Sequence, residues 1–182
     1  MQRAQPIYAH CSRRFRAVHT SGKRNPRAIR WIVLHDEESK TAFAAAAWFA
    51  NRASQGSAHL CVDDRICYRT LDNDDVPWGA PGANEHGFHI EQAGFARWST
   101  VIWKGHLRTL QRAAYKSAFH CRAFGIPPRF VAANGLRAGV TGITTHAECS
   151  KAFGGGHRDP GRFWPRRLFM SLVRRYYAQI GV

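Results

Sequence analysis

The sequence predicts a single α/β domain in which a central mixed β-sheet is flanked by helices. Short segments rich in β-branched and aromatic residues alternate with longer segments of helical periodicity, the pattern of such domains. The length of 182 residues suits one domain, and a hydrophobic content of 45% is too high for a disordered chain. Without an internal repeat or linker, we expect a basic N-terminal arm over residues 1–27 and one folded domain over residues 28–182.

The first half of the domain is expected to hold three strands and one helix. The run IRWIVLH over residues 29–35 has the composition of a buried strand. Residues 41–52 are rich in alanine and predict a helix that Ser39 can cap. Residues 58–62 and 66–70 predict the two strands of a hairpin around a tight turn.

The second half is expected to hold a strand and two long helices. Residues 71–86 read as a loop, residues 88–92 as a strand, and residues 104–124 as a helix that ends before a glycine and two prolines. Residues 165–180 repeat the helical spacing. The glycine-rich stretch TTHAECSKAFGGGHRDPG, residues 144–161, has no regular period and is expected to be irregular.

The charge of the chain points to a polyanionic partner. With 27 Lys and Arg against 12 Asp and Glu the net charge is +15, which would attract either nucleic acid or an anionic cell envelope. No nucleic-acid recognition motif accompanies the charge, so nucleic acid is not the expected partner. The longest apolar run, residues 42–50, is shorter than the roughly 20 residues of a membrane span, and the N-terminus lacks the apolar core of a signal peptide.

The cysteines give no sign of a disulfide framework. Their number, five, is odd and no CxxC motif occurs, so neither a disulfide framework nor a thiolate zinc knuckle is expected. This usage suggests synthesis in a reducing compartment. The five residues are Cys11, Cys61, Cys67, Cys121 and Cys149.

Three histidines stand where chemistry is plausible. His35 ends the first predicted strand, and α/β sheets present ligands and catalytic groups at such ends. His146, His157 and Asp159 lie in the irregular glycine-rich stretch. Two imidazoles and one carboxylate with an open fourth position are the ligand set of a catalytic zinc site. Taken singly, each histidine is more typical of a surface or core residue, so only their combination indicates a functional site.

Other local patterns compete with this interpretation. His146-Ala147-Glu148 matches half of a zinc deaminase motif, but no P-C-x-x-C follows. Cys149 is either an additional ligand or a small buried hydrophobe. A Cys-His hydrolase is not favoured, because the other central cysteines fall inside predicted strands and a helix rather than beside a helix N-terminus or a cation.

Five motifs, in this order, resemble one known family. The motifs IVLH, SAHLCVDDRICYR, WGAPGAN, FHIEQAG and HRDPG are similar to those of the type 2 N-acetylmuramoyl-L-alanine amidases, whose fold is shared by peptidoglycan-recognition proteins and the amidase domains of phage endolysins. The resemblance covers residues 29–164, most of the chain. It implies the same fold, a zinc-dependent activity and peptidoglycan as the substrate.

The resemblance also implies roles for single residues. His35, His146 and Asp159 would ligate Zn²⁺, Glu91 would be the catalytic carboxylate, and His157 stands where the family commonly has a lysine that stabilises the transition state. The interval from His146 to Asp159 is longer than in many relatives, which leaves Cys149 or His157 as alternative third ligands. Histidine in place of lysine would make that role pH-dependent.

Three further residues are assigned to the substrate groove, where an aromatic face and amide groups suit a glycan-peptide. They are His59, Trp78 and Asn84. His59 is equally consistent with a buried structural residue, and the other two with residues that fix the loop.

The expected function is hydrolysis of the amide bond between N-acetylmuramic acid and L-alanine by a phage lysis enzyme. It would be made in the host cytoplasm without a signal peptide, act at the bacterial cell wall, and be held there by attraction of its basic surface to anionic wall polymers. A recycling amidase for soluble muropeptides, a non-catalytic peptidoglycan-recognition module and a basic nucleic-acid-binding protein are the alternatives.

Overall fold

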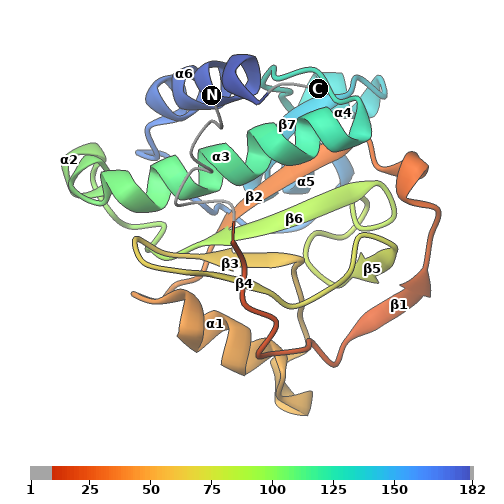
Figure 1. Ribbon diagram of the computed structural model, residues 1–182. Coiled ribbons are helices and arrows are strands. Elements are labelled where there is room, and N and C mark those ends of the chain that lie inside the picture. Colours follow the sequence, from red (N-terminus) through yellow and green to blue (C-terminus); the bar gives the residue numbers. More distant parts are fainter. Residues whose placement is uncertain (1–9, 181–182) are drawn as a thin grey trace, which may run out of the picture.

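A five-stranded mixed sheet forms the centre of the molecule in the computed structural model, which describes residues 10–180 (Figure 1). The strand order is β4-β3-β6-β2-β7, and β4 alone runs antiparallel to its neighbour. The expected α/β fold with a mixed sheet is confirmed. The strands are β2 (Trp31–Asp36), β3 (Leu60–Val62), β4 (Cys67–Arg69), β6 (Gly87–Gln92) and β7 (Gly142–Thr145).

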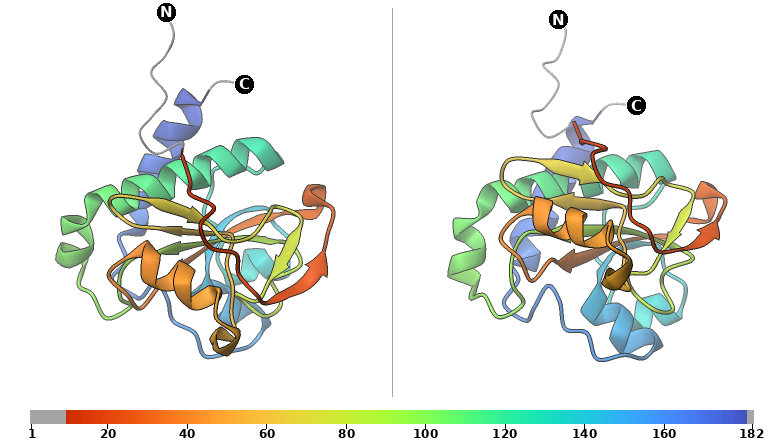
Figure 2. Two further views of the ribbon diagram at one scale, coloured as in Figure 1. Left: turned by 60° about the horizontal axis from the view of Figure 1, so that its bottom comes forward. Right: turned by 90° about the horizontal axis from the view of Figure 1, so that it is seen from below.

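Helices cover both faces of this sheet. The long helix α3 lies across one face with α6 packed on it, while α1 lies on the opposite face (Figures 1 and 2). Helix α5 contacts β7 and β2 and packs against α4. Within residues 10–180, no helix is long and apolar enough to cross a membrane. The helices are α1 (Ala42–Phe49), α2 (Thr100–Gly105), α3 (Leu107–Phe124), α4 (Ala133–Arg137), α5 (His146–Phe153) and α6 (Arg166–Gln179), with 3-10 turns η1 (Pro26–Ala28) and η2 (Arg52–Ser54).

Alternation along the central strands decides which side chains face α3 and which face the site. In β2, Ile32 and Leu34 join the core cluster that includes α3 and α6, whereas Trp31 and Val33 belong to a second cluster on the other face. His35 continues this second set because side chains two residues apart share a face. The end of β2 therefore directs an imidazole away from the large core.

Local structure departs from the sequence prediction at several elements. Thr41, not Ser39, caps α1, since its hydroxyl accepts a hydrogen bond from the Ala44 amide. The helix predicted over residues 104–124 is divided at His106 into α2 and α3. The expected loop 71–86 contains strand β5 (Asp75–Pro77), which pairs with β1 (Thr20–Lys23). The β1–β5 pairing joins segments that lie far apart in the sequence, which no local periodicity reveals.

The glycine-rich stretch is more regular than expected. Its first residues complete β7 and continue directly into α5, which Thr145 caps by accepting a hydrogen bond from the Glu148 amide. Only the part after Phe153 is irregular. Thr145, followed three residues later by Glu148, matches the capping signature that is typical of a helix N-terminus.

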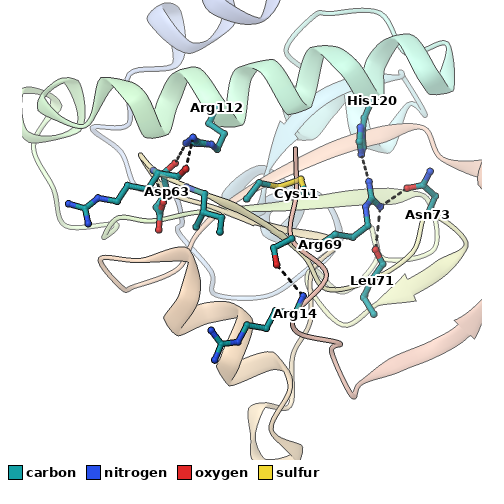
Figure 3. Close-up of a disulfide and its surroundings, with 12 residues drawn as sticks. Cys11, Arg14, Asp63, Arg69, Leu71, Asn73, Arg112 and His120 are labelled. Atoms are coloured by element: carbon teal, nitrogen blue, oxygen red, sulfur yellow. Dashed lines mark hydrogen bonds between the residues drawn. A yellow bond between two sulfur atoms is a disulfide. The ribbon is translucent and has the colours of Figure 1, made fainter. Parts of the chain in front are cut away.

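The N-terminal segment is attached to the domain by a disulfide. Cys11 bonds Cys67 of β4, a disulfide that the number and spacing of the cysteines did not predict (Figure 3). Ser12 continues the attachment, because its amide donates to the Cys67 carbonyl and its carbonyl accepts from the Arg69 amide. Spacing could not reveal this bond, because the two cysteines are separated by 56 positions while their Cα atoms are only 4.5 Å apart.

The predicted arm therefore contains integral parts of the fold. Residues 1–9 lie outside the described residues, but strand β1 falls within the arm, and Arg24 is buried. The Arg24 guanidinium donates to the Asn84 and Glu85 carbonyls, and burial lowers its pKa to about 10. This cation thus holds the loop before β6 rather than facing solvent.

Candidate metal centre

Two neighbouring parallel strands supply the floor of the site. His35 and Glu91 are register partners at the carboxyl ends of β2 and β6. Both are buried, and the His35 Nδ1 atom lies 4.0 Å from the Glu91 Oε1 atom. Because directly opposed residues on adjacent strands point to the same face, the pairing brings an imidazole and a carboxylate together without any loop.

His146 and Asp159 complete a cluster of three groups. His146 is the first residue of α5, and the Ala147 amide donates to the Asp159 carbonyl at 2.9 Å, which brings the end of the glycine-rich stretch back over the helix. The His35 and His146 Nδ1 atoms are 3.1 Å apart. The two Asp159 oxygens lie 3.1 Å from these same nitrogens, one from each.

The chemistry of this donor set fits a zinc ion. Three ligands around a tetrahedral zinc at Zn–N and Zn–O distances near 2.0–2.1 Å stand roughly 3.3 Å from one another. The His35 and His146 nitrogens stand 3.1 Å apart, and each has one Asp159 oxygen at the same distance, so the separations are of this size. Two imidazole nitrogens and one carboxylate oxygen leave a fourth position open, as in catalytic zinc sites.

Burial shapes the charge of both carboxylates. Burial alone would raise the pKa of Asp159, but hydrogen bonds with His146 and His35 outweigh it and hold the pKa well below its usual range. The pKa of Glu91 is raised, first by burial and then by the negative charge of Asp159. Its Oε2 atom has no hydrogen-bond partner among the described residues. The site thus pairs a firmly ionised carboxylate with one that readily holds a proton.

The two alternative third ligands occupy different places. Cys149 is buried in the apolar cluster with Trp31 and Val33, and burial raises its pKa to about 12, so a thiolate is disfavoured there. His157 stacks on His146 with 3.9 Å between ring centroids, and 62% of its side chain is exposed. Of these candidates, only Asp159 clusters with both histidines within the described chain.

A groove of about 1060 Å³ opens above the cluster. Trp78 and Asn84 line it together with the cluster, Glu91 and His157. The Asn84 side-chain oxygen also accepts hydrogen bonds from the Gly79 and Ala80 amides, so this residue fixes the loop as well.

His59 is not brought to the groove. Its side chain is fully buried, its Nδ1 atom accepts from the His89 amide, and its ring stacks on Phe88. The structure thus places it among the buried structural residues, the other interpretation that the sequence left open.

Sequence reasoning missed two features of the site. His89, two residues before Glu91 on β6, lies 3.0 Å from His35; its position in the alternation of the strand FHIEQ was the available signal. The second feature is a basic groove of about 1200 Å³ that shares Ala96, Gly156, His157 and Arg158 with the first groove. The cations lining this basic groove are Arg97, Lys104, Lys151, Arg158, Arg162, Arg166 and Arg167.

Comparison with known proteins identifies the family. The family model for N-acetylmuramoyl-L-alanine amidase, Amidase_2, matches residues 25–162. The chain belongs to this family of type 2 amidases. No curated protein sequence matches it closely enough to count as a relative.

Solved structures share the fold at low sequence identity. The Staphylococcus aureus hydrolase AmiA, solved with its ligand, superimposes with a TM-score of 0.74 at 18% identity, covering 97% of this chain and 92% of AmiA. A mutant endolysin from Bacillus subtilis gives 0.57 at 19% identity, with 94% and 99% covered. A selenomethionine derivative of AmpD gives 0.63 at 15% identity, with 93% and 98% covered.

Proposed function

We propose that this protein is a zinc-dependent N-acetylmuramoyl-L-alanine amidase that cleaves the amide bond between N-acetylmuramic acid and L-alanine in peptidoglycan. The observation that carries the proposal is the buried cluster of His35, His146 and Asp159 with Glu91 beside it, in a chain of the amidase family. Hydrolysis of an unactivated amide needs a polarised carbonyl, a nucleophile and a proton for the leaving amine, and the site has a group for each need.

The three clustered residues would hold the zinc. When bound, zinc supplies Lewis-acid polarisation of a carbonyl oxygen and lowers the pKa of water. Among the chain's own groups, Glu91 is the one placed to move protons, because it lies beside the cluster and its raised pKa suits both acceptance and release. It would take a proton from the attacking water and deliver it to the nitrogen of the departing L-alanine.

His157 would stabilise the oxyanion that develops at the scissile carbonyl. The residue stands at the exposed edge of the cluster, stacked on His146, with its Nδ1 atom 3.7 Å from Asp159. A ring nitrogen that donates into the groove from this edge performs the role of an oxyanion donor. The exposed face of Trp78 would hold the glycan-peptide in the same groove.

The basic groove would hold an anionic wall polymer beside the reacting strand. Seven cations line it, and the one carboxylate among its lining residues, Glu148, is occupied by Lys151 at 2.7 Å and by the Ala133 amide. Because the groove joins the catalytic groove at His157 and Arg158, a polymer bound there lies alongside the substrate. Such a contact concentrates the enzyme on the wall by long-range attraction.

Within this activity, we favour a lysis enzyme of a phage acting on the intact wall, because the basic groove suits a polyanionic surface more than a small soluble fragment. A recycling amidase would prefer soluble muropeptides over sacculi. A silent recognition module would bind sacculi without cleaving them.

The activity is tested on purified sacculi. The protein is incubated with sacculi as prepared, with a chelator, and with chelator followed by zinc, and new L-alanine amino termini are measured against new reducing sugar ends. We expect amino termini that vanish with the chelator and return with zinc. Sugar ends instead, or no products under any condition, would refute the amidase.

The wall contact is tested by two variants that remove the same charge. The groove variant carries Arg162→Gln, Arg166→Gln and Arg167→Gln, and its control carries Arg108→Gln, Arg174→Gln and Arg175→Gln on exposed helix surfaces. In sedimentation with sacculi, we expect binding of the groove variant to fall about tenfold with a flatter salt dependence, and the control to behave like the wild type. Equal losses of sacculus binding in the groove variant and the control would show that wall binding depends on the overall charge and not on the basic groove.

A further inference from the structure

His89 contacts His35 of the cluster through one of its ring nitrogens. Its Nδ1 atom lies 3.0 Å from the Nε2 atom of His35, and the two rings stack with 5.1 Å between centroids. The other ring nitrogen of His35, Nδ1, faces His146 and Asp159. The two nitrogens of one imidazole are thus divided between the cluster and His89.

The fold holds the His89 ring in a fixed place. The side chain has no exposed surface, and its backbone amide donates to the Nδ1 atom of His59, itself buried. Gly79 and Gly87 leave room for the ring, since a Cβ atom added at either position would collide with it. The sequence therefore combines a large side chain at position 89 with two residues that have none.

The protonation pattern follows from this division. A nitrogen that ligates a metal carries no proton, so a neutral His35 that ligates through Nδ1 must carry its proton on Nε2. That proton points at the Nδ1 atom of His89. A neutral imidazole accepts one hydrogen bond at its unprotonated nitrogen. The Nδ1 atom of His89 faces the Nε2 atom of His35, whereas its buried Nε2 atom has no hydrogen-bond partner within the described residues.

We propose that His89 is a positioning residue: its Nδ1 atom accepts the Nε2 proton of His35 and so fixes the tautomer and ring orientation in which His35 presents Nδ1 to the metal. The inference rests on the proposed zinc site and adds to it a residue outside the ligand set. In metalloproteins, partners of this kind set metal affinity, and their loss typically weakens binding about 10–100-fold.

The affinity test uses a substitution and its rescue. His89→Leu keeps the approximate volume and removes the acceptor, whereas His89→Asn restores an oxygen close to the place of Nδ1. His120→Leu serves as the control, because His120 is an equally buried histidine on α3 outside the site. Zinc affinity is measured by competition with a chromophoric chelator, and the visible spectrum of the cobalt-substituted protein reports ligand geometry.

We expect His89→Leu to weaken zinc binding 10–100-fold and to shift the cobalt bands. His89→Asn should return the affinity to within about threefold of the wild type, and His120→Leu should leave it unchanged. Wild-type affinity in His89→Leu, or equal losses in the Leu and Asn variants, would overturn the role. A wild-type protein that binds no zinc would instead refute the proposed function itself.

A measurement on the unaltered protein does not depend on the folding of any variant. Long-range ¹H–¹⁵N correlation spectra of the zinc-loaded protein assign the tautomer of each histidine. We expect His35 protonated at Nε2 and His89 unprotonated at Nδ1. A proton on the Nδ1 atom of His89 would exclude it as the acceptor, whatever the variants show.

Discussion

His35 and Glu91 face each other directly across the parallel pairing of β2 and β6, one residue before the end of each strand. A proposed metal ligand and a proposed proton carrier are therefore held on adjacent strands of the central sheet, with 4.0 Å between the Nδ1 atom of His35 and the Oε1 atom of Glu91. Sites built on strands keep their geometry better than sites built on loops. The loop-borne members, Asp159 and His157, complete this fixed pair.

Glu91→Gln should abolish hydrolysis and leave the zinc in place. Glutamine keeps the volume of the side chain but neither accepts nor releases a proton, so kcat should fall by about 10²-fold or more. The product assay gives kcat, and metal analysis after dialysis gives zinc content. Near-normal turnover with full zinc content would remove Glu91 from the mechanism.

His157→Ala should separate turnover from metal binding. The side chain is 62% exposed and lies outside the cluster, so zinc content and the free energy of unfolding should change little. Loss of an oxyanion donor should lower kcat by about 10²–10³-fold. If the variant instead lost zinc while its kcat per bound ion stayed normal, His157 would be a ligand.

Asp75→Asn should weaken the fold in a pH-dependent way. Burial would raise the pKa of Asp75, but ion pairs with Arg16 at 2.7 Å and Lys23 at 2.9 Å outweigh it and hold the pKa at about 2. Because the folded pKa lies below the unfolded one, this stabilisation is present above pH ~4 and is lost as the pH falls toward ~2. Urea unfolding should show a loss of about 1–3 kcal/mol at neutral pH.

The difference between Asp75→Asn and the wild type should narrow between pH ~4 and ~2. A difference that stayed constant over this range would mean that the two ion pairs contribute nothing to folding.

Reduction of the Cys11–Cys67 disulfide should lower the free energy of unfolding by about 2–4 kcal/mol, because the bond closes a long loop in the unfolded chain. Cys11→Ser should show the same loss. As a control, Cys11→Ser is treated with reductant, and its free energy of unfolding should not fall further. A wild type insensitive to reductant would show that the bond does not form in solution.

Sequence alone predicted the parts of the site that depend on local pattern. The run IRWIVLH predicted a strand that ends at His35, and residues 88–92 were predicted as a strand that contains Glu91; strands occur at both places. The role of Glu91 came from the family resemblance. His146 was found as a candidate, but its helix was not, because glycines close behind Phe153 masked the capping signature at Thr145. Local pattern thus locates a residue better than it describes the element that carries it.

Features that depend on tertiary contact were beyond the sequence. Three contacts join segments about 50 or more residues apart: the β1–β5 pairing, the Cys11–Cys67 bond and the hydrogen bonds that hold the buried Arg24. The contact between His89 and His35 could not be predicted either, since it depends on the orientation of one ring against another. Hydrophobic period carries no information on such distances.

The three clustered groups come from positions 35, 146 and 159, so an ion held by them would tie the first central strand to the end of the last long loop. The disulfide already ties position 11 to position 67. An occupied site would thus act as a second cross-link. The chain segment that the disulfide closes, residues 11–67, and the segment that the metal would close, residues 35–159, overlap. Removing the metal would then lower the local stability of the C-terminal half, so that proteases cleave residues 154–161 before the rest of the chain unfolds.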